Sequence, residues 1–393
     1  MTFIFQLPRQ AVLIFFLILA ATTCTSSLIP TMGYFIVEGL GQPAWKIGFF
    51  TGFMALITMG LNRLFGQKLD AGFKPRLLIG GSIVCFMCFA GLAASMPDFW
   101  IFAVVGAPLM AMSNSASGTT FTFGRQYANQ NNLDAGRYNA FLRTAISIAW
   151  MIGPASAFLL IDQFGFQKSY LLSASAGLVW LGLWAVTVPK DFHGTQSPKS
   201  AVSIAGIDWA LWFAAVACTC FALSNVIFTS VLPLFLIKDA QLPGYAPGVS
   251  LTAKCFVEVF AIFSAARLAE RFGARNVMLA SAALAIVVFN LFAQADSMIE
   301  VVFLAALEGL YYGLFAGISI TFIQNFTPTT PGRATAIYMN SLFLGSMIGS
   351  VSMGFIASAF SFGTVVIFAA FSSACAFITL LVTRKMKPRE ATA

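Results

Sequence analysis

Twelve apolar stretches, each long enough to cross a lipid bilayer, constrain the fold of this 393-residue chain more than any other feature. The hydrocarbon core of a bilayer is about 30 Å thick, so a helix needs about 20 apolar residues to span it. The chain has 59% hydrophobic and 9% charged residues, whereas a soluble domain has about 25% charged residues. It must therefore be embedded in lipid. The stretches lie near residues 10–37, 46–67, 77–96, 99–122, 140–161, 168–188, 207–236, 247–269, 275–294, 298–322, 335–359 and 362–383.

The two halves of the sequence match each other at an offset of about 200 residues. Pro30 in the first apolar stretch has a counterpart in the seventh, Pro233. The loop at residues 66–70 has its counterpart at 266–270. Two further matches are Arg137 with Arg333 and Gly153 with Gly349. Duplicated halves are typical of secondary transporters.

The predicted fold is an all-α integral membrane protein, with twelve transmembrane helices in two pseudo-symmetric six-helix bundles. Residues 1–189 would form the N-terminal bundle, and residues 207–393 the C-terminal bundle with a short basic tail. The segment 190–206 is polar and rich in turn-forming residues, which predicts a cytoplasmic linker between the bundles. We expect the protein to be a monomer.

The positive charges of the loops and tails gather on one side of the membrane. If both termini are cytoplasmic, the outer loops contain only Lys46, Lys168 and Lys238 of the 22 lysines and arginines. Basic residues concentrate in cytoplasmic loops of membrane proteins, so this bias predicts cytoplasmic termini. The net charge of +8 then reflects topology and attraction to anionic lipid, and it gives no reason to expect a nucleic-acid partner.

The sequence does not indicate an enzyme or a bound cofactor. The only histidine, His193, lies in the predicted linker. No phosphate-binding G-x-x-x-x-G-K-[ST] loop occurs, and no segment outside the apolar stretches is long enough for a nucleotide-binding domain. The seven cysteines fall within apolar stretches, where buried thiols are expected rather than a metal site. With no nucleotide-binding domain expected, the energy for transport must come from a gradient.

Four charged residues are candidates for positions deep in the membrane: Arg143, Lys254, Glu258 and Glu308. A charge at the bilayer centre costs about 2.5–3.5 kcal/mol, so it normally faces the interior of a bundle and has a partner. Lys254 and Glu258 are four residues apart on one helical face and can reach each other. Burial favours a protonated carboxyl group and a nearby ammonium favours the carboxylate, so Glu258, Glu308 and Lys254 are candidates for proton coupling. The alternative is a static ion pair that holds the bundle together.

Polar and aromatic residues in the same stretches form a candidate site for a solute. A polyol needs many hydrogen-bond partners, because a buried polar group left unpaired costs about 1–3 kcal/mol. An aromatic ring can cover the apolar face of a sugar. The candidate substrate-binding residues are Glu308, Tyr312, Asn340, Arg143, Asn114, Trp150 and Asn225. The alternative is that most small polar residues only permit close helix packing.

The loop between spans 8 and 9 reads Leu268-Ala269-Glu270-Arg271-Phe272-Gly273-Ala274-Arg275, and the loop between spans 2 and 3 keeps Gly66 and Asp70. With two six-helix halves, this pattern resembles the major facilitator superfamily, whose loop signature is G-x-L-A-D-R-x-G-R-[KR]. The resemblance implies that the acidic residue of each loop helps to lock the outward-facing state. Asp70 would pair with a cation such as Arg125. Gly153-Pro154 is similar to the end of the superfamily's antiporter motif, so the candidate gating residues are Asp70, Arg125, Glu270, Arg271, Gly153 and Pro154.

A narrower resemblance involves the segment between spans 10 and 11. Phe322-Ile323-Gln324-Asn325-Phe326-Thr327-Pro328, followed by Gly332 to Asn340, is similar to the bacterial sugar efflux transporter family, which usually has aspartate at the place of Asn325. This resemblance implies a transporter of the bacterial inner membrane that exports a sugar or glycoside in exchange for protons, by alternating access. The alternatives are a multidrug/proton antiporter, whose cavity the 42 phenylalanines could line, and a transporter of another small polar solute such as an organic acid. A channel or a membrane enzyme does not explain the duplicated halves.

Overall fold

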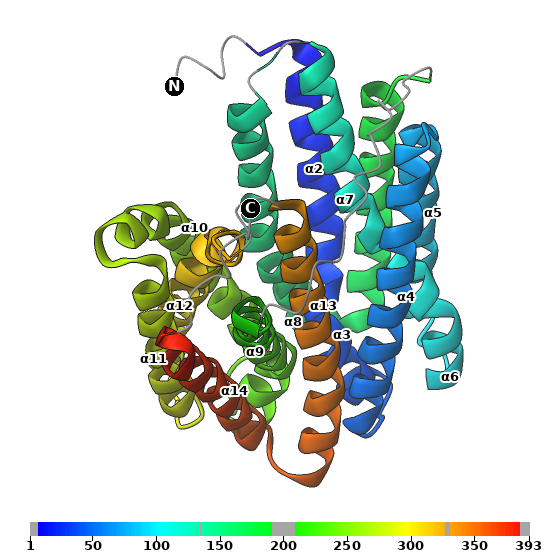
Figure 1. Ribbon diagram of the computed structural model, residues 1–393. Coiled ribbons are helices and arrows are strands. Elements are labelled where there is room, and N and C mark those ends of the chain that lie inside the picture. Colours follow the sequence, from blue (N-terminus) through cyan, green and yellow to red (C-terminus); the bar gives the residue numbers. More distant parts are fainter. Residues whose placement is uncertain (1–6, 132, 134, 191–208, 327–330, 386–393) are drawn as a thin grey trace, which may run out of the picture. The chain divides into compact units, whose positions relative to one another are not determined.

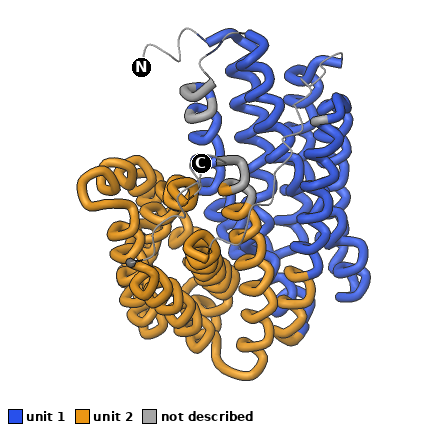
Figure 2. The backbone as a smooth tube through the Cα atoms, viewed as in Figure 1, with its two compact units in different colours: residues 1–42, 53–199 blue, residues 43–52, 200–393 orange. Residues whose placement is uncertain are grey.

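The computed structural model describes residues 7–131, 133, 135–190, 209–326 and 331–385 (Figure 1). These residues form helices joined by short turns and contain no strand. Two compact units are present, residues 1–42 with 53–199 and residues 43–52 with 200–393 (Figure 2). The predicted linker, 190–206, lies outside the described residues except for Lys190.

The helices of the first half begin with a long interrupted span and end with α8, which Gly165 divides into two helical segments. In order they are α2 (Arg9–Leu28), η1 (Ile29–Thr31), α3 (Met32–Tyr34), η2 (Phe35–Gly39), α4 (Trp45–Asp70), α5 (Pro75–Ala94), α6 (Phe99–Ile101), η3 (Phe102–Gly106), α7 (Ala107–Gln130) and α8 (Ala135–Thr187). The second half has α9 (Trp209–Leu234), η4 (Phe235–Asp239), α10 (Ala246–Phe272), α11 (Ala274–Phe292), α12 (Met298–Gln324), α13 (Pro331–Ala359), α14 (Phe362–Val382) and η5 (Thr383–Lys385).

Eleven helical stretches of the described chain are long and apolar enough to cross a membrane. One of them, within α8, holds two spans, because Gly165 breaks the helix with φ 77° and ψ 172°. Gly165 falls between the predicted spans at 140–161 and 168–188. The prediction of an all-α membrane protein with twelve transmembrane helices is therefore confirmed.

In the fourth span, the helix is longer than the apolar stretch of the sequence. The predicted stretch ends at residue 122, but α7 continues to Gln130. The extra turns carry Arg125, Gln126 and Asn129, which lower the hydropathy without breaking the helix. Hydropathy marks the lipid-embedded part of a helix and not its end, so the membrane boundary and the helix boundary differ here.

The duplication seen in the sequence recurs in the backbone. The first span ends in the π-helical turn η2 (Phe35–Gly39), and the seventh ends in the π-helical turn η4 (Phe235–Asp239), at an offset of 200 residues. Matching hydrogen bonds close both turns, Leu40 N to Phe35 O and Ala240 N to Phe235 O, each 2.9 Å. A third π-helical turn, η3 (Phe102–Gly106), has no counterpart in α12, so the match of η2 with η4 supports a duplication only together with the sequence repeat.

A second duplicated feature follows the segments 66–70 and 266–270, which the sequence indicates as loops but which form the ends of α4 and α10. Gly72 and Gly273 take positive φ angles of 82° and 84°, which only glycine adopts readily, and each precedes a new helix. The second residue of that helix is an arginine in both halves. Arg275 donates to Leu380 O (2.8 Å) and Thr383 Oγ1 (2.9 Å) at the end of α14. Arg76 donates to Val188 O just after α8. Each arginine thus satisfies carbonyl groups that the last helix of its half leaves free.

The first unit is held by close contacts of α8 with α2 and α5. Gly153 of α8 lies against α2, where an added Cβ would be 3.1 Å from Ser27 N and 3.2 Å from Thr23 O. Ser26 Oγ donates to Ala149 O at 3.0 Å in the same contact. Gly177 allows α8 to approach α5 in a similar way, since an added Cβ would be 2.6 Å from Met87.

Candidate functional site

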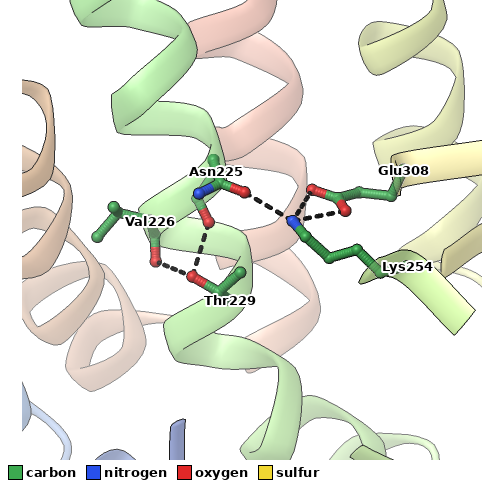
Figure 3. Close-up of polar contacts among 5 residues, drawn as sticks. All are labelled: Asn225, Val226, Thr229, Lys254 and Glu308. Carbon is green, nitrogen blue, oxygen red and sulfur yellow. Dashed lines mark hydrogen bonds and ion pairs between the residues drawn. The ribbon is translucent and has the colours of Figure 1, made fainter. Parts of the chain in front are cut away.

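A buried ion pair in the second unit joins two helices. Lys254 Nζ of α10 lies 2.7 Å from Glu308 Oε1 and 2.7 Å from Oε2 of α12 (Figure 3). Lys254 is 5% exposed and Glu308 is 0% exposed. The charges are thus withdrawn from any surrounding medium and depend on each other for compensation.

A third helix reaches the same ammonium group. Asn225 of α9 accepts a hydrogen bond from Lys254 Nζ through Oδ1, at 2.7 Å (Figure 3). The backbone carbonyl of Asn225 in turn accepts from Thr229 Oγ1 at 2.8 Å. Lys254 therefore joins α9, α10 and α12 through charge-assisted hydrogen bonds, which are stronger than neutral ones.

Glycines at every fourth position of α12 bring this helix against α10. An added Cβ at Gly309 would collide with Lys254 O. At Gly313 it would lie 2.6 Å from Glu258 O, and at Gly317 2.8 Å from Ile262 O. Small residues four apart form one face of a helix and let two backbones approach closely. The glycine face of α12 (Gly309, Gly313, Gly317) thus places Glu308 beside Lys254.

Aromatic rings surround the ion pair. The ring of Tyr312 has its centre 4.9 Å from Lys254 Nζ, and that of Phe228 is 5.9 Å away. A cation is attracted to the face of an aromatic ring at such distances. One turn further along α12, Phe315 stacks on Phe221 of α9, with ring centres 4.4 Å apart. The polar cluster is therefore surrounded by aromatic side chains.

Glu258 lies one turn after Lys254 on α10 and is half-buried. The sequence suggests contact between the two, but the structure pairs Lys254 with Glu308 instead. The reason is the glycine face of α12, which brings a carboxylate from another helix within 2.7 Å. Among the residues that the structure describes, Glu258 forms no ion pair of its own. Lys254, Glu258 and Glu308 together therefore supply two carboxylates and one ammonium group.

The other four predicted substrate-binding residues lie on other helices. Asn340 of α13 is exposed. In the first unit, Arg143 is exposed and Trp150 is half-buried, both on α8. Asn114 of α7 is half-buried, and its Oδ1 has no hydrogen-bond partner within the described part of the chain. Of the seven predicted residues, the structure brings Asn225, Glu308 and Tyr312 together around Lys254.

The predicted gating residues fall into two groups. Gly153 and Pro154 are buried, and Gly153 makes the close contact with α2 described above. Arg125, Glu270 and Arg271 are exposed. The side chain of Asp70 lies outside the described residues, so its pairing with Arg125 stays a prediction.

Sequence reasoning did not single out the glycine face of α12. Its G-x-x-x-G-x-x-x-G spacing, Gly309-Gly313-Gly317, is visible in the sequence and is a known signal for close helix packing. The sequence also gives no contact partner for Arg76 and Arg275, the two arginines at the start of α5 and α11. Their carbonyl partners are more than 100 residues away, so the sequence offers no local signal for these contacts.

Gly313→Ala is expected to lower the stability of the protein by about 1–3 kcal/mol, because the added methyl group would push α12 away from the backbone of α10. The thermal unfolding of purified protein in detergent measures the effect. Gly118→Ala is the matched control, since no atom lies within 4 Å of a Cβ added there. That variant should be as stable as wild type, or more stable by up to about 1 kcal/mol. Equal stability of both variants would contradict close packing at Gly313.

Two helical units with duplicated backbone features, in a chain with twelve spans and a buried polar cluster, define a secondary transporter of the membrane rather than an enzyme. Comparison with known proteins gives the family. A family model of the Major Facilitator Superfamily matches residues 131–257 and 247–393, more than half of the chain. The chain belongs to the major facilitator superfamily.

Similar proteins include two bacterial relatives and a solved transporter structure. Sugar efflux transporter A of Escherichia coli (strain K12) is 25% identical over 360 residues, covering 90% of this chain and 91% of that protein. Sugar efflux transporter B of Salmonella typhimurium is 26% identical over 367 residues, covering 90% and 91%. The crystal structure of a mutant of the nucleoside transporter NupG matches the fold with a TM-score of 0.82 and 15% identity, covering 96% of this chain and 100% of that chain.

Proposed function

We propose that this protein exports sugars or glycosides across the bacterial inner membrane in exchange for protons, by alternating access. The buried cluster of Asn225, Lys254 and Glu308 beside Tyr312 is the observation that carries the proposal. Such polar groups inside membrane helices are costly and generally serve function. The names of the relatives, sugar efflux transporters, support a sugar as the solute.

The residues of the cluster match the chemistry of a sugar. A carboxylate accepts hydrogen bonds from hydroxyl groups, and an asparagine amide can both donate and accept. The half-buried ring of Tyr312 can cover the apolar face of a pyranose. The cluster's one cation is already paired with Glu308, so an organic acid would have to displace that carboxylate. The cluster therefore favours a neutral polyol over an acid.

The charge balance of the cluster supports proton coupling. When all groups are ionised, Glu258, Glu308 and Lys254 together carry a net charge of −1. An uncompensated charge inside a membrane bundle is unfavourable, and one proton removes it. Glu258 is the group without an ion pair in the described chain, so we assign the transported proton to it.

Purified protein in liposomes tests the function. Radiolabelled D-glucose, D-galactose, citrate and ethidium are offered in parallel, with and without an imposed pH gradient. We expect a saturable flux of at least one of the two sugars, accelerated by a gradient that drives protons the opposite way and collapsed by a protonophore. Flux of ethidium or citrate alone would overturn the proposal in favour of a drug antiporter or an acid transporter.

Orientation in the membrane follows from the distribution of basic residues. We infer cytoplasmic termini, because the outer loops of this arrangement hold three of the 22 lysines and arginines. A reporter enzyme that is active only in the cytoplasm, fused after Ala393, should be active in cells. An inactive fusion together with an active periplasmic reporter would reverse the orientation.

A further inference from the structure

The orientation of the Asn225 side chain is chemically determined by Lys254. An ammonium group has three hydrogen-bond donors and no acceptor, whereas an asparagine amide has an acceptor oxygen and a donor nitrogen. The atom of Asn225 that faces Lys254 Nζ at 2.7 Å must therefore be the oxygen (Figure 3). The amide nitrogen, Nδ2, consequently points away from the ammonium group.

The ammonium group is itself held in place. It lies 2.7 Å from both carboxylate oxygens of Glu308, and the α10 backbone of Lys254 packs against Gly309. The hydrogen bond from Thr229 Oγ1 to the backbone carbonyl of Asn225 (2.8 Å) lies within α9 and leaves the amide group free to respond to Lys254. A rotation of the amide by half a turn would set its N–H groups against the ammonium group, at the loss of a charge-assisted hydrogen bond. The observed orientation is thus strongly favoured.

The amide nitrogen is then a donor without an acceptor. Within the described part of the chain, no oxygen accepts a hydrogen bond from Asn225 Nδ2. The side chain is half-buried, and it stands beside the Lys254–Glu308 pair that the Tyr312 ring also contacts. The nitrogen itself is not among the buried unpaired atoms, so a hydrogen-bond partner from outside the chain can reach it. A solute oxygen would be such a partner.

We propose that Lys254 is a positioning residue that turns Asn225 so that the site offers a hydrogen-bond donor to one acceptor oxygen of the sugar. This inference rests on the proposed function and adds a rule of specificity to it. At one position of the sugar ring, Asn225 Nδ2 donates a hydrogen bond to the sugar oxygen. Recognition at this position therefore does not require the hydrogen of the hydroxyl group. Glu308 has the complementary preference, since a carboxylate reads hydroxyl groups only as donors.

Sugar analogues separate the two kinds of recognition. The probes are D-glucose and D-galactose with each hydroxyl in turn replaced by hydrogen (deoxy) or by O-methyl, which keeps the acceptor oxygen and removes the donor. We expect one ring position at which the O-methyl analogue binds wild-type protein much better than the deoxy analogue. The expected difference is about 5- to 30-fold, as for one hydrogen bond of about 1–2 kcal/mol.

Asn225→Asp is the decisive variant, because it keeps the volume and the contact with Lys254 but replaces the donor with an acceptor. It should abolish the preference for O-methyl over deoxy at that position. Lys254→Met should also abolish it, because the amide can then rotate. Lys254→Arg should retain it, because a guanidinium group is likewise a donor only. If Lys254→Met does not fold, Asn225→Asp and Lys254→Arg still test whether the preference for O-methyl over deoxy depends on the amide donor.

The possible results separate this inference from the proposed function. Binding of neither parent sugar overturns the proposed function and this inference with it. Binding of a parent sugar without an acceptor-dependent position, or with one that persists in Asn225→Asp, overturns this inference and leaves the function standing. A merely structural role of Lys254 would change the affinity for all analogues alike and leave their ranking unaltered.

Discussion

Glu258→Gln is expected to abolish proton-driven transport while the exchange of sugar for sugar continues. The glutamine has the shape of the acid but neither binds nor releases a proton, so the variant resembles a permanently protonated site. Sugar exchange requires the protein to alternate only while it is loaded, and a neutral site permits that. We expect the pH gradient to have no effect on sugar flux in the variant, whereas the half-time of exchange stays within about threefold of wild type.

The matched control for this variant is Glu300→Gln. Glu300 is a carboxylate in the first turn of α12 in the same unit, but it is exposed. Its neutralisation should leave both coupled transport and exchange intact. If Glu258→Gln responds to the gradient as wild type does, Glu258 does not carry the proton. Loss of exchange as well as coupling would point to a role of Glu258 in solute binding.

The fold could be predicted from the sequence because the membrane imposes a simple rule. Backbone groups in lipid must be satisfied within the chain, so each long apolar stretch becomes a helix. This rule, with the offset of 200 residues, is enough to reach twelve spans and the duplication. Even Gly165, which divides α8, lies where two predicted stretches meet. The rule does not predict how far a helix continues beyond the lipid, as the polar end of α7 shows.

The site was harder to predict because its contacts join separate helices. Lys254, Glu308 and Asn225 could each be named, since a charge or amide within an apolar stretch is conspicuous. Their arrangement could not, because Glu258 is four residues from Lys254 and Glu308 is 54 residues away. The short separation in the sequence favours a pair of Lys254 with Glu258. The structure pairs Lys254 with Glu308 instead, because the glycine face of α12 brings α12 close to α10.

The close contact of α10 with α12 also has a consequence for how the second unit can move. Gly309, Gly313 and Gly317 interlock with the backbone of α10 over two turns, so these helices are expected to move as one body. Asn225 belongs to α9, which packs closely on α13 at Gly345 and Gly349 and on α14 through Ser224 and Ser373, and which meets α12 also through the Phe221–Phe315 stack. The hydrogen bond from Lys254 to Asn225 therefore joins two groups of helices. A change in the charge of Lys254 or Glu308 would be transmitted to α9 through the hydrogen bond from Lys254 to Asn225.

Lys254→Met is expected to destabilise the protein by about 3–5 kcal/mol, because it leaves the carboxylate of Glu308 buried without its counter-charge. The double variant Lys254→Met/Glu308→Leu should recover most of that loss, since apolar residues of similar volume can replace a buried ion pair at little cost. Thermal unfolding in detergent measures both effects.

Transport by the double variant distinguishes a static ion pair from a functional one. If the pair only holds α10 and α12 together, a stable double variant should transport sugar as wild type does. We expect it instead to fold and to lose at least about 90% of coupled sugar flux. Glu308 would no longer accept hydrogen bonds from the solute, and Asn225 would no longer be turned by Lys254. The second outcome follows from the two roles that the geometry gives to one ammonium group: it compensates a buried charge, and it orients the neighbouring amide.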